Sequence, residues 1–274
     1  MRANMLGGQC AECGVDVPAQ AGFRIGCGRA AVIVCRRHRP VPPPRGDHQG
    51  WHTQPLAALD FETTGVDPYG DRIISYAALG PGTGPDLVGM VHPQIPIPRS
   101  AAQIHGISDA DVARAPGPAA ALRELSAWID HLVVLDAPLV VFNATFDLTL
   151  LRAELRRHGI GQPRWDALTV IDPFVIDYGI ERGRLGSRRL GDVADYYGIK
   201  LDNAHDAETD ARVARDVAIE LGARHRATVF PERPLVMAQQ RFWAAQRAMD
   251  YNRLALRRGR RIDPVGDWPF APPG

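Results

Sequence analysis

From Pro55 onward, short apolar segments alternate with longer segments whose apolar residues recur at helical spacing, and this alternation constrains the fold more than any other feature. Strands are predicted at residues 55–61, 72–79, 87–92 and 138–142. Helices are predicted at residues 119–132, 146–158, 188–197, 206–222 and 234–258. Early strands followed by alternating strands and helices indicate an α/β domain, in which helices flank a mixed sheet.

The remaining sequence falls into blocks of different composition. Residues 1–38 contain every cysteine, and residues 39–54 are rich in proline and polar side chains. We therefore expect a small N-terminal module at 1–38 and a linker with polyproline II character at 39–54. The α/β domain is predicted to occupy 55–225, and 226–274 would form a helical, arginine-rich C-terminal extension.

The extension is expected to contain one long helix, since Pro234 suits a first helical turn and Gly259 suits a helix end. Large apolar residues recur there every seven positions, at Leu235, Phe242, Met249 and Leu256. We expect this stripe to pack on the core of the domain. Pairing with a partner is the alternative.

Charge is distributed unevenly along the chain. Residues 1–50 carry a net charge of +4, residues 51–223 carry −9, and residues 224–274 carry +6. Such an arrangement fits a metal-binding centre with arms that meet a polyanion, and an ordinary solvated surface is the alternative. There is no apolar run of the roughly 18–20 residues that a membrane span needs. The N-terminus also lacks the apolar core of a secretory signal, so we expect a cytoplasmic protein.

The segment LAALDFETTG places two carboxylates at the end of an apolar strand. Side chains two positions apart share one face of a strand, so Asp60 and Glu62 are predicted to point the same way. Two like charges in a partly apolar place are costly unless a cation lies between them. Taken alone, the segment also fits a solvated edge of a sheet.

Two later segments add further acids and a histidine. Asp147 follows the strand at 138–142 and lies in the first turn of a helix. Functional sites of α/β sheets gather just past the ends of strands. The alternative is that Asp147 only interacts favourably with the positive helix N-terminus. Asp206 is a candidate helix cap, which places Asp210 in the second turn of that helix. His205 lies just before the helix and is freer to approach a reacting water.

Taken together, these segments resemble the DnaQ-like 3′–5′ exonucleases of the RNase H-like superfamily, in the subclass with a histidine general base (DEDDh). The matching segments, in chain order, are DFETTG at 60–65, QIHGI at 103–107, NATFD at 143–147 and HDAETD at 205–210. The other subclass has a tyrosine four residues before the last aspartate, where this chain has Asp206. The resemblance extends from residue 55 to about residue 222 and implies an RNase H-like core.

The resemblance also implies roles for the acids. Two divalent ions, Mg²⁺ or Mn²⁺, would be held by hard oxygen ligands. Asp60 would bridge both ions, and Asp147 would hold one of them. Glu62 and Asp210 would hold the ion that carries the attacking water. His205 would take the proton from that water, because imidazole titrates near neutral pH.

A second set of residues is expected to contact the terminal nucleotide. Its members are Thr63, Thr64, Gly65, Ile104, His105 and Asn143. The backbone at 63–65 would contact the 3′ end, whereas Ile104 and His105 would line the pocket for the terminal base and sugar. A packed core histidine is the alternative for His105.

The N-terminal module carries a different metal signature. Cys10 and Cys13 form one C-x-x-C pair, and Cys35 and His38 form a C-x-x-H pair, with a predicted hairpin between them. This spacing is typical of a structural Zn²⁺ site, and the ion would replace the core that so short a segment cannot build. Cys27 could take the place of His38, or the thiols could be reduced and free of metal. The module would bind phosphate or a protein; its basic residues are Arg24, Arg29, Arg36, Arg37 and Arg39.

We therefore predict a metal-dependent 3′–5′ exonuclease that releases 5′-mononucleotides from single-stranded DNA. An exoribonuclease resembling oligoribonuclease or ribonuclease T is one alternative. A nucleic-acid-binding adaptor without turnover is another, and the complete set of acids with His205 argues against it. A proofreading or repair role would require a polymerase or repair partner. A basic tail would grip the strand; it consists of Arg253, Arg257, Arg258, Arg260 and Arg261.

Overall fold

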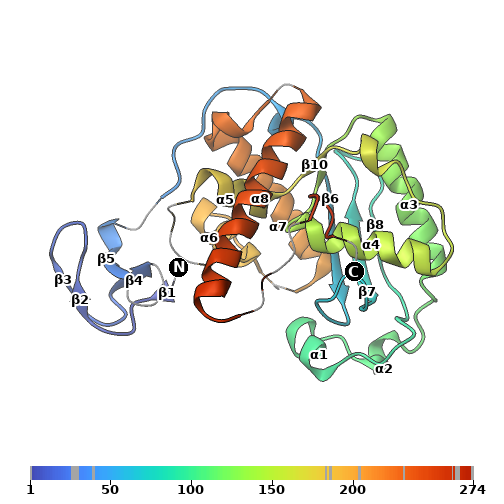
Figure 1. Cartoon of the computed structure of the whole chain (residues 1–274), viewed down its shortest axis with the longest axis horizontal. Helices are drawn as coiled ribbons and strands as arrows, with labels where there is room; N and C mark the ends of the chain where they lie inside the picture. Colours follow the sequence, from blue (N-terminus) through green and yellow to red (C-terminus); the bar gives the residue numbers. More distant parts are fainter. Residues whose placement is uncertain are drawn as a thin grey trace.

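The computed structural model describes residues 2–25, 31–38, 41–182, 184, 187–202, 205–230, 232–260, 262 and 266–272. Its main part is a five-stranded mixed sheet flanked by helices, which confirms the predicted fold class (Figure 1). The strand order is β10-β9-β6-β7-β8. The bounds are Ala57–Thr63 for β6, Ile73–Leu79 for β7, Leu87–Met90 for β8, Leu139–Val140 for β9 and Val170–Ile171 for β10.

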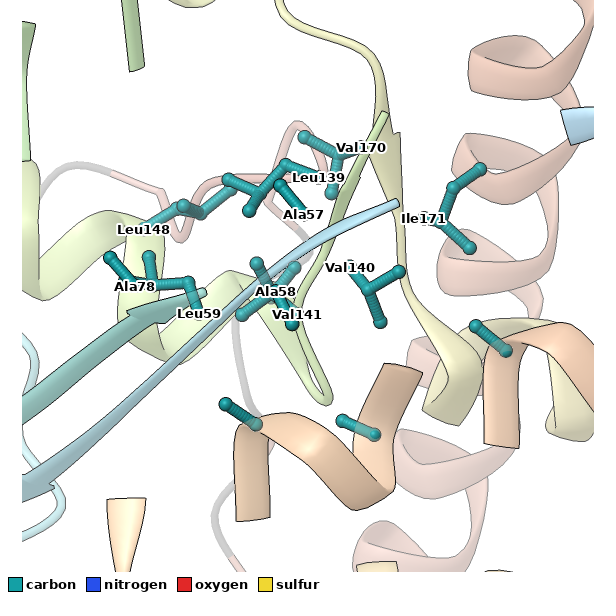
Figure 2. Close-up of a cluster of buried hydrophobic side chains, with 14 of the residues drawn as sticks. Ala57, Ala58, Leu59, Ala78, Leu139, Val140, Val141, Leu148, Val170 and Ile171 are labelled. Atoms are coloured by element: carbon teal, nitrogen blue, oxygen red, sulfur yellow. The ribbon is translucent and has the colours of Figure 1, made fainter. Parts of the chain in front are cut away.

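The central strand β6 determines where the site forms. It pairs antiparallel with β7 and parallel with β9, so it has a neighbour on both edges. Ala57, Ala58 and Leu59 are fully buried, which explains why the first half of β6 is apolar on both faces. Figure 2 shows Leu59 in a cluster of buried apolar side chains that also includes Leu148, which lies on the helix that follows β9. The strand thus runs from a dry core toward its polar end.

Helices supply the layers around this sheet. Their bounds are Arg99–His105 for α1, Asp109–Val112 for α2, Ala119–Val134 for α3, Ala144–Arg157 for α4, Pro173–Ile180 for α5, Leu190–Tyr197 for α6, Ala207–Arg224 for α7 and Arg233–Arg257 for α8. Helix α7 packs on β6 and β7, and α4 packs on α3 and β7. Small side chains, Ala207, Ala211, Ala214 and Ala218, are buried along α7 and let it approach the sheet closely. None of the helices in the described ranges is long and apolar enough to cross a membrane.

The long helix α8 corrects one prediction. The stripe of Leu235, Phe242, Met249 and Leu256 does not pack on the core: these side chains are 46%, 56%, 59% and 66% exposed. Helix α8 packs instead on α5 and buries Val236, Met237, Gln240 and Trp243. Gln240 decides the orientation, because its side chain accepts the Asp172 N–H at 2.7 Å and donates to the Val170 carbonyl at 2.8 Å. The seven-residue pattern therefore marks the solvent face.

The N-terminal module has its own small sheets. Its strands are Arg2–Ala3 (β1), Gly8–Gln9 (β2), Asp16–Val17 (β3), Gly22–Ile25 (β4) and Val32–Cys35 (β5), followed by a short 3₁₀ helix, Arg36–His38. Strands β4 and β5 pair antiparallel, so the predicted hairpin is confirmed. Cys27, Arg29 and Arg39 lie outside the described residues. Residues 41–50 form no helix or strand, and Gly46 N donates a hydrogen bond to the Ala223 carbonyl near the end of α7 at 2.7 Å.

Candidate active site

The polar end of β6 carries the first two acids. Asp60 and Glu62 lie on one face of the strand, opposite Ala77 and Ser75 of β7. The pairing register shifts between Glu62 and Thr63, which is a β-bulge, and bulges re-aim side chains at the ends of strands. Glu62 is 8% exposed although it is a carboxylate, so the strand buries charge at this point.

The third acid is placed by the turn between β9 and α4. Asn143 precedes the helix in the left-handed backbone region, at φ 63° and ψ 50°, which asparagine tolerates better than most residues. Asp147 follows in the first helical turn and is 5% exposed. The helix N-terminus carries partial positive charge, which favours a carboxylate there. Asp147 is nevertheless buried beside other acids, so this interaction alone does not account for it.

Helix α7 brings the fourth acid and the histidine. Asp206 caps the helix and accepts the Thr209 N–H at 3.0 Å, as predicted. His205 has a positive φ of 71°, and its backbone N–H donates to Asp210 Oδ2 at 3.3 Å. The side chain of His205 is exposed, whereas Oδ1 of Asp210 is buried and has no hydrogen-bond partner. The exposed imidazole of His205 therefore lies close to a carboxylate that has one buried oxygen without a hydrogen-bond partner.

The structure brings three of the predicted site residues together. Ligand atoms of Glu62, His205 and Asp210 all lie within 4.8 Å of one another, and Asp60 and Asp147 are not part of this close cluster. Burial raises the pKa of the Asp60 carboxyl well above its usual range, and the negative charges of Asp147, Asp210 and Glu62 raise it further. Residues from β6, α4 and α7, far apart in the sequence, thus share one electrostatic environment.

The other carboxyls show the same strain. Burial, and then the charge of Asp210, raises the pKa of Glu62 to about 7. The pKa of Asp147 is raised well above its usual value, mainly by burial. Burial also raises the pKa of Asp210, and the N–H of His205 partly offsets it. A concentration of buried negative charge with raised pKa values is costly for a structural core and is typical of a cation site.

His105 lies at the end of α1 next to this group. Its Nδ1 accepts the Ile107 N–H at 3.1 Å, while its Nε2 is buried without a partner. Burial lowers the pKa of His105, a contact with the Thr63 backbone raises it in part, and the nearby His205 lowers it. Since Nε2 makes no hydrogen bond of ordinary geometry, this atom can still contact a ligand. Ile104 beside it is 58% exposed.

In the loop after β6, the side chain of Thr64 stabilises the loop itself. Thr64 is 1% exposed, and its hydroxyl donates to Asp71 Oδ1 at 2.8 Å and accepts the Arg72 N–H at 2.9 Å. A Cβ on Gly65 would lie 2.5 Å from the Asp71 carboxylate, so this position requires glycine. The side chain of Thr64 is therefore committed to the loop, and its predicted contact with a substrate would have to come from the backbone.

Sequence reasoning missed Asp172, the cap of α5, which is fully buried. Its carboxylate accepts the backbone N–H groups of Asn143 at 2.9 Å and Ala144 at 3.0 Å, and the indole N–H of Trp268 at 3.2 Å. Burial raises the pKa of Asp172 to about 6, against the lowering effect of these donors. Asp172 thereby fixes the turn that precedes Asp147. The Asp172-Pro173 pair, which is typical of a helix start, was the sequence signal that could have identified this cap.

We expect Asp172→Asn to lower the free energy of unfolding by about 2–4 kcal/mol, because an amide nitrogen cannot accept N–H groups and leaves buried donors unpaired. Urea unfolding monitored by circular dichroism measures this. Asp166→Asn, an exposed change in the preceding segment, is the matched control and should shift the midpoint by no more than about 0.5 kcal/mol. Equal midpoints for Asp172→Asn and the wild type would contradict the assigned role.

A second group of metal-type side chains lies in the N-terminal module. Cys10, Cys13, Cys35 and His38 have ligand atoms within 4.8 Å of one another. These are the residues that the sequence pairs predicted, and Cys10, Cys13 and Cys35 are free thiols. This cluster contains no carboxylate, so its chemistry differs from that of the site on β6.

Comparisons with known proteins agree with the position of the acidic site. The family model described as "Exonuclease" (RNase_T) matches residues 57–218, which include all four acids, His105 and His205. DNA polymerase III subunit epsilon of Treponema pallidum is 30% identical over 175 residues, covering 62% of this chain and 77% of that protein. The 3′-5′ exonuclease DinG of Bacillus subtilis is 27% identical over 183 residues, covering 65% of this chain but 19% of that protein.

Solved structures show the same fold. E. coli Exonuclease I in complex with a dA16 oligonucleotide superposes with a TM-score of 0.55 at 21% identity, covering 64% of this chain and 42% of that chain. At this identity the likeness concerns the fold. The N-terminal module, with its cysteine cluster, lies before the family match.

Proposed function

This chain belongs to the RNase T/DnaQ-like exonuclease family, whose model spans more than half of its length, and from this membership we propose that it removes 5′-mononucleotides from the 3′ end of single-stranded DNA. One observation carries the proposal: ligand atoms of Glu62, His205 and Asp210 lie within 4.8 Å of one another, and the half-buried Asp60 shares their electrostatic environment. An adaptor without turnover would not need buried acids whose charges oppose one another.

The acids fit the divalent cations that this family uses. Hard carboxylate oxygens are the ligands that Mg²⁺ and Mn²⁺ prefer. Oδ1 of Asp210 is a buried acceptor without a hydrogen-bond partner. Burial, and then the surrounding negative charge, raises the pKa of Asp60, and a cation would relieve both. We assign Asp60, Glu62, Asp147 and Asp210 as the residues that hold these ions. When bound, the ions would supply charge neutralisation and Lewis-acid activation for phosphodiester hydrolysis.

The chain's own groups then have separate tasks. His205 accepts the proton of the attacking water. Its imidazole is exposed next to the acids, and the residue lies in the loop before α7. Asp210 holds the backbone N–H of His205 and so orients the loop that carries the base. Asp147 lies in the first turn of α4, after the left-handed turn at Asn143, and we assign it to the same centre.

The terminal nucleotide would bind between α1 and the loop after β6. The unpartnered Nε2 of His105 supports a polar contact to the terminal sugar or base, and the exposed Ile104 supports an apolar contact. Gly65 lets the loop backbone pass close to the strand end, and we assign backbone groups at 63–65 to the 3′ terminus. Asn143 is exposed at the rim and completes this set.

DNA is favoured over RNA because a relative with 77% of its length matched is named as a DNA polymerase III subunit. The same relative supports a polymerase or repair partner for this chain. An exoribonuclease remains the second candidate, since a single contact to a 2′-OH separates the two substrates. The basic tail would bind the strand upstream of the cut; its described members Arg253, Arg257, Arg258 and Arg260 are exposed, and Arg261 lies outside the described residues.

The test is digestion of matched DNA and RNA oligomers of one sequence, each labelled at the 5′ end, with Mn²⁺ or Mg²⁺. We expect a ladder that shortens from the 3′ end and free 5′-mononucleotides, with DNA degraded faster. Faster degradation of RNA would replace the substrate assignment. If neither oligomer were shortened in the presence of either metal, the proposed function would be contradicted.

A further inference from the structure

The N-terminal module brings its two cysteine-containing segments together by backbone pairing. Cys10 forms a parallel bridge with Ile33, and the next residue, Ala11, donates its N–H to the Ile33 carbonyl at 2.8 Å. A tight turn follows, closed by Gly14 N to the Cys10 carbonyl at 2.8 Å, with Gly14 at φ +70°. This turn presents Cys13 on the same side as Cys10. Residues 10–13 therefore form a loop over the end of β5.

The second pair comes from the opposite segment. Cys35 ends β5, and His38 closes the 3₁₀ helix that follows it directly. Nδ1 of His38 lies 3.4 Å from Cys10 Sγ and 3.3 Å from Cys35 Sγ. The backbone N–H of Cys35 donates to Cys10 Sγ at 3.3 Å, a contact that stabilises a thiolate. One imidazole nitrogen is thus aimed between sulfur atoms of both segments.

These separations match those of ligands around one ion. For tetrahedral Zn²⁺ with Zn–S of about 2.3 Å and Zn–N of about 2.0 Å, neighbouring ligands lie about 3.5–3.8 Å apart. The observed distances of 3.3 and 3.4 Å are close to this range, and all four ligand atoms fall within 4.8 Å. Three sulfurs and one nitrogen would supply all four ligands of a tetrahedral ion and leave no open position for substrate.

The module has little else to hold it together. Its buried apolar cluster consists of Cys10, Val17 and Val34, with a few partly buried side chains around them. Segments of fewer than about 40 residues rarely fold without a metal or a disulfide. The large hydrophobic core of the protein, from Trp51 to Trp268, is a separate cluster.

We propose that Cys10, Cys13, Cys35 and Nδ1 of His38 bind one Zn²⁺ and that this ion folds the N-terminal module. The proposal goes beyond the exonuclease function, because the module precedes the family match at residues 57–218. The site is structural, since its four positions are filled by protein ligands. The proposal takes His38 as the fourth ligand, and Cys27, the alternative, lies outside the described residues.

The test uses the full chain and does not depend on nuclease activity. Zinc is measured by mass spectrometry in protein purified without chelator, and Co²⁺ is then exchanged into the protein. Thiolate-to-cobalt charge transfer reports cysteine ligands and is silent for ions held by the carboxylates of the acidic site. We expect one tightly held zinc per chain and a charge-transfer band in the wild type.

Matched cysteine variants distinguish the ligand set. Cys13→Ser and Cys35→Ser should lose the zinc and the charge-transfer band, whereas Cys27→Ser should keep both. His38→Cys should keep zinc as a four-cysteine site, which separates loss of a ligand from general misfolding. Loss of zinc in Cys27→Ser, or its retention in His38→Ala, would overturn the assigned ligands. A wild-type protein without zinc, or with a Cys10–Cys35 disulfide, would overturn the site itself.

Proteolysis tests the folding part of the proposal. After treatment with a zinc-selective chelator, trypsin should cut at Arg24, Arg36 and Arg37 much faster, while the fragment containing the main core stays resistant. Added zinc should restore protection. Unchanged cleavage at these arginines after complete removal of zinc would show that the ion does not hold the module.

Discussion

Asp60→Asn is expected to reduce mononucleotide release to background while making the metal-free protein more stable. The substitution preserves the size of the side chain and removes one negative charge from the centre of the acidic site. Catalysis fails because Asp60 is the acid that faces all three others, so its loss disrupts binding of both proposed ions. The fold is retained because β6 is held by pairing with β7 and β9 and by its apolar first half.

The gain in stability follows from the direction of the pKa shift. The folded pKa of Asp60 is raised, so the folded state binds a proton more tightly than the unfolded state does. Stability from this carboxyl is therefore present at acid pH and is lost as the pH rises from its ordinary pKa through its folded pKa. Asparagine does not titrate, so the variant should exceed the wild type at about pH 8, and the difference should shrink toward about pH 4.

Thermal unfolding with and without Mn²⁺ measures the change in stability, and the nuclease assay measures the loss of mononucleotide release. Mn²⁺ should raise the midpoint of the wild type and have much less effect on Asp60→Asn. Asp166→Asn, an exposed aspartate outside the site, should behave like the wild type in every assay. Asp60→Asn protein that cleaved DNA at the wild-type rate would exclude Asp60 from the site.

His205→Ala should lower the single-turnover rate by about 10²–10⁴-fold, as expected for loss of a general base. The imidazole is exposed and near Glu62 and Asp210, but no packing interaction of its ring holds the fold together in the described structure. Alanine at φ 71° adds backbone strain. His205→Asn is therefore the better second variant, because asparagine adopts the left-handed region more readily and cannot accept the proton.

The same variants separate a base from a metal ligand, since His205 lies within ligand distance of two acids. If His205 acts as the base, the shift of the unfolding midpoint by Mn²⁺ should be retained in both variants while the chemical step slows. Loss of that shift would make His205 a ligand instead. His131→Ala, an exposed histidine on α3, is the control and should keep the full rate. Wild-type single-turnover cleavage by His205→Asn would remove the assigned base.

Most strands and helices after Pro55 were predicted from the sequence. Strands β6, β7, β8 and β9 and helices α3, α4, α6, α7 and α8 lie within a few residues of their predicted bounds. The short elements α1, α2, α5 and β10 were missed. Strand β10 has two residues, Val170 and Ile171, and a pair of residues has no measurable period. It exists because its backbone completes the parallel edge of β9.

The face of α8 is the clearest case in which a local pattern misled. The heptad of large apolar residues predicted a buried stripe, but the helix turns Gln240 and Trp243 inward instead. A polar contact decides this orientation, because the buried backbone of Asp172 and Val170 needs the amide of Gln240 for its hydrogen bonds. These backbone groups belong to the segment at Val170 and Asp172, so the sequence of α8 does not reveal which of its faces is buried.

The sequence by itself determined which side chains are proposed to carry the chemistry: Asp60, Glu62, Asp147, His205 and Asp210. They belong to short motifs, and the structure puts these motifs at the ends of strands and the starts of helices. The tertiary structure alone decided how these residues are held. Asp172 reaches back 28 residues to Ala144 and forward 96 residues to Trp268, and no local period encodes a hydrogen bond over such separations. The pairing of Cys10 and Cys13 with Cys35 and His38 through β-bridging is likewise a result of the folded chain.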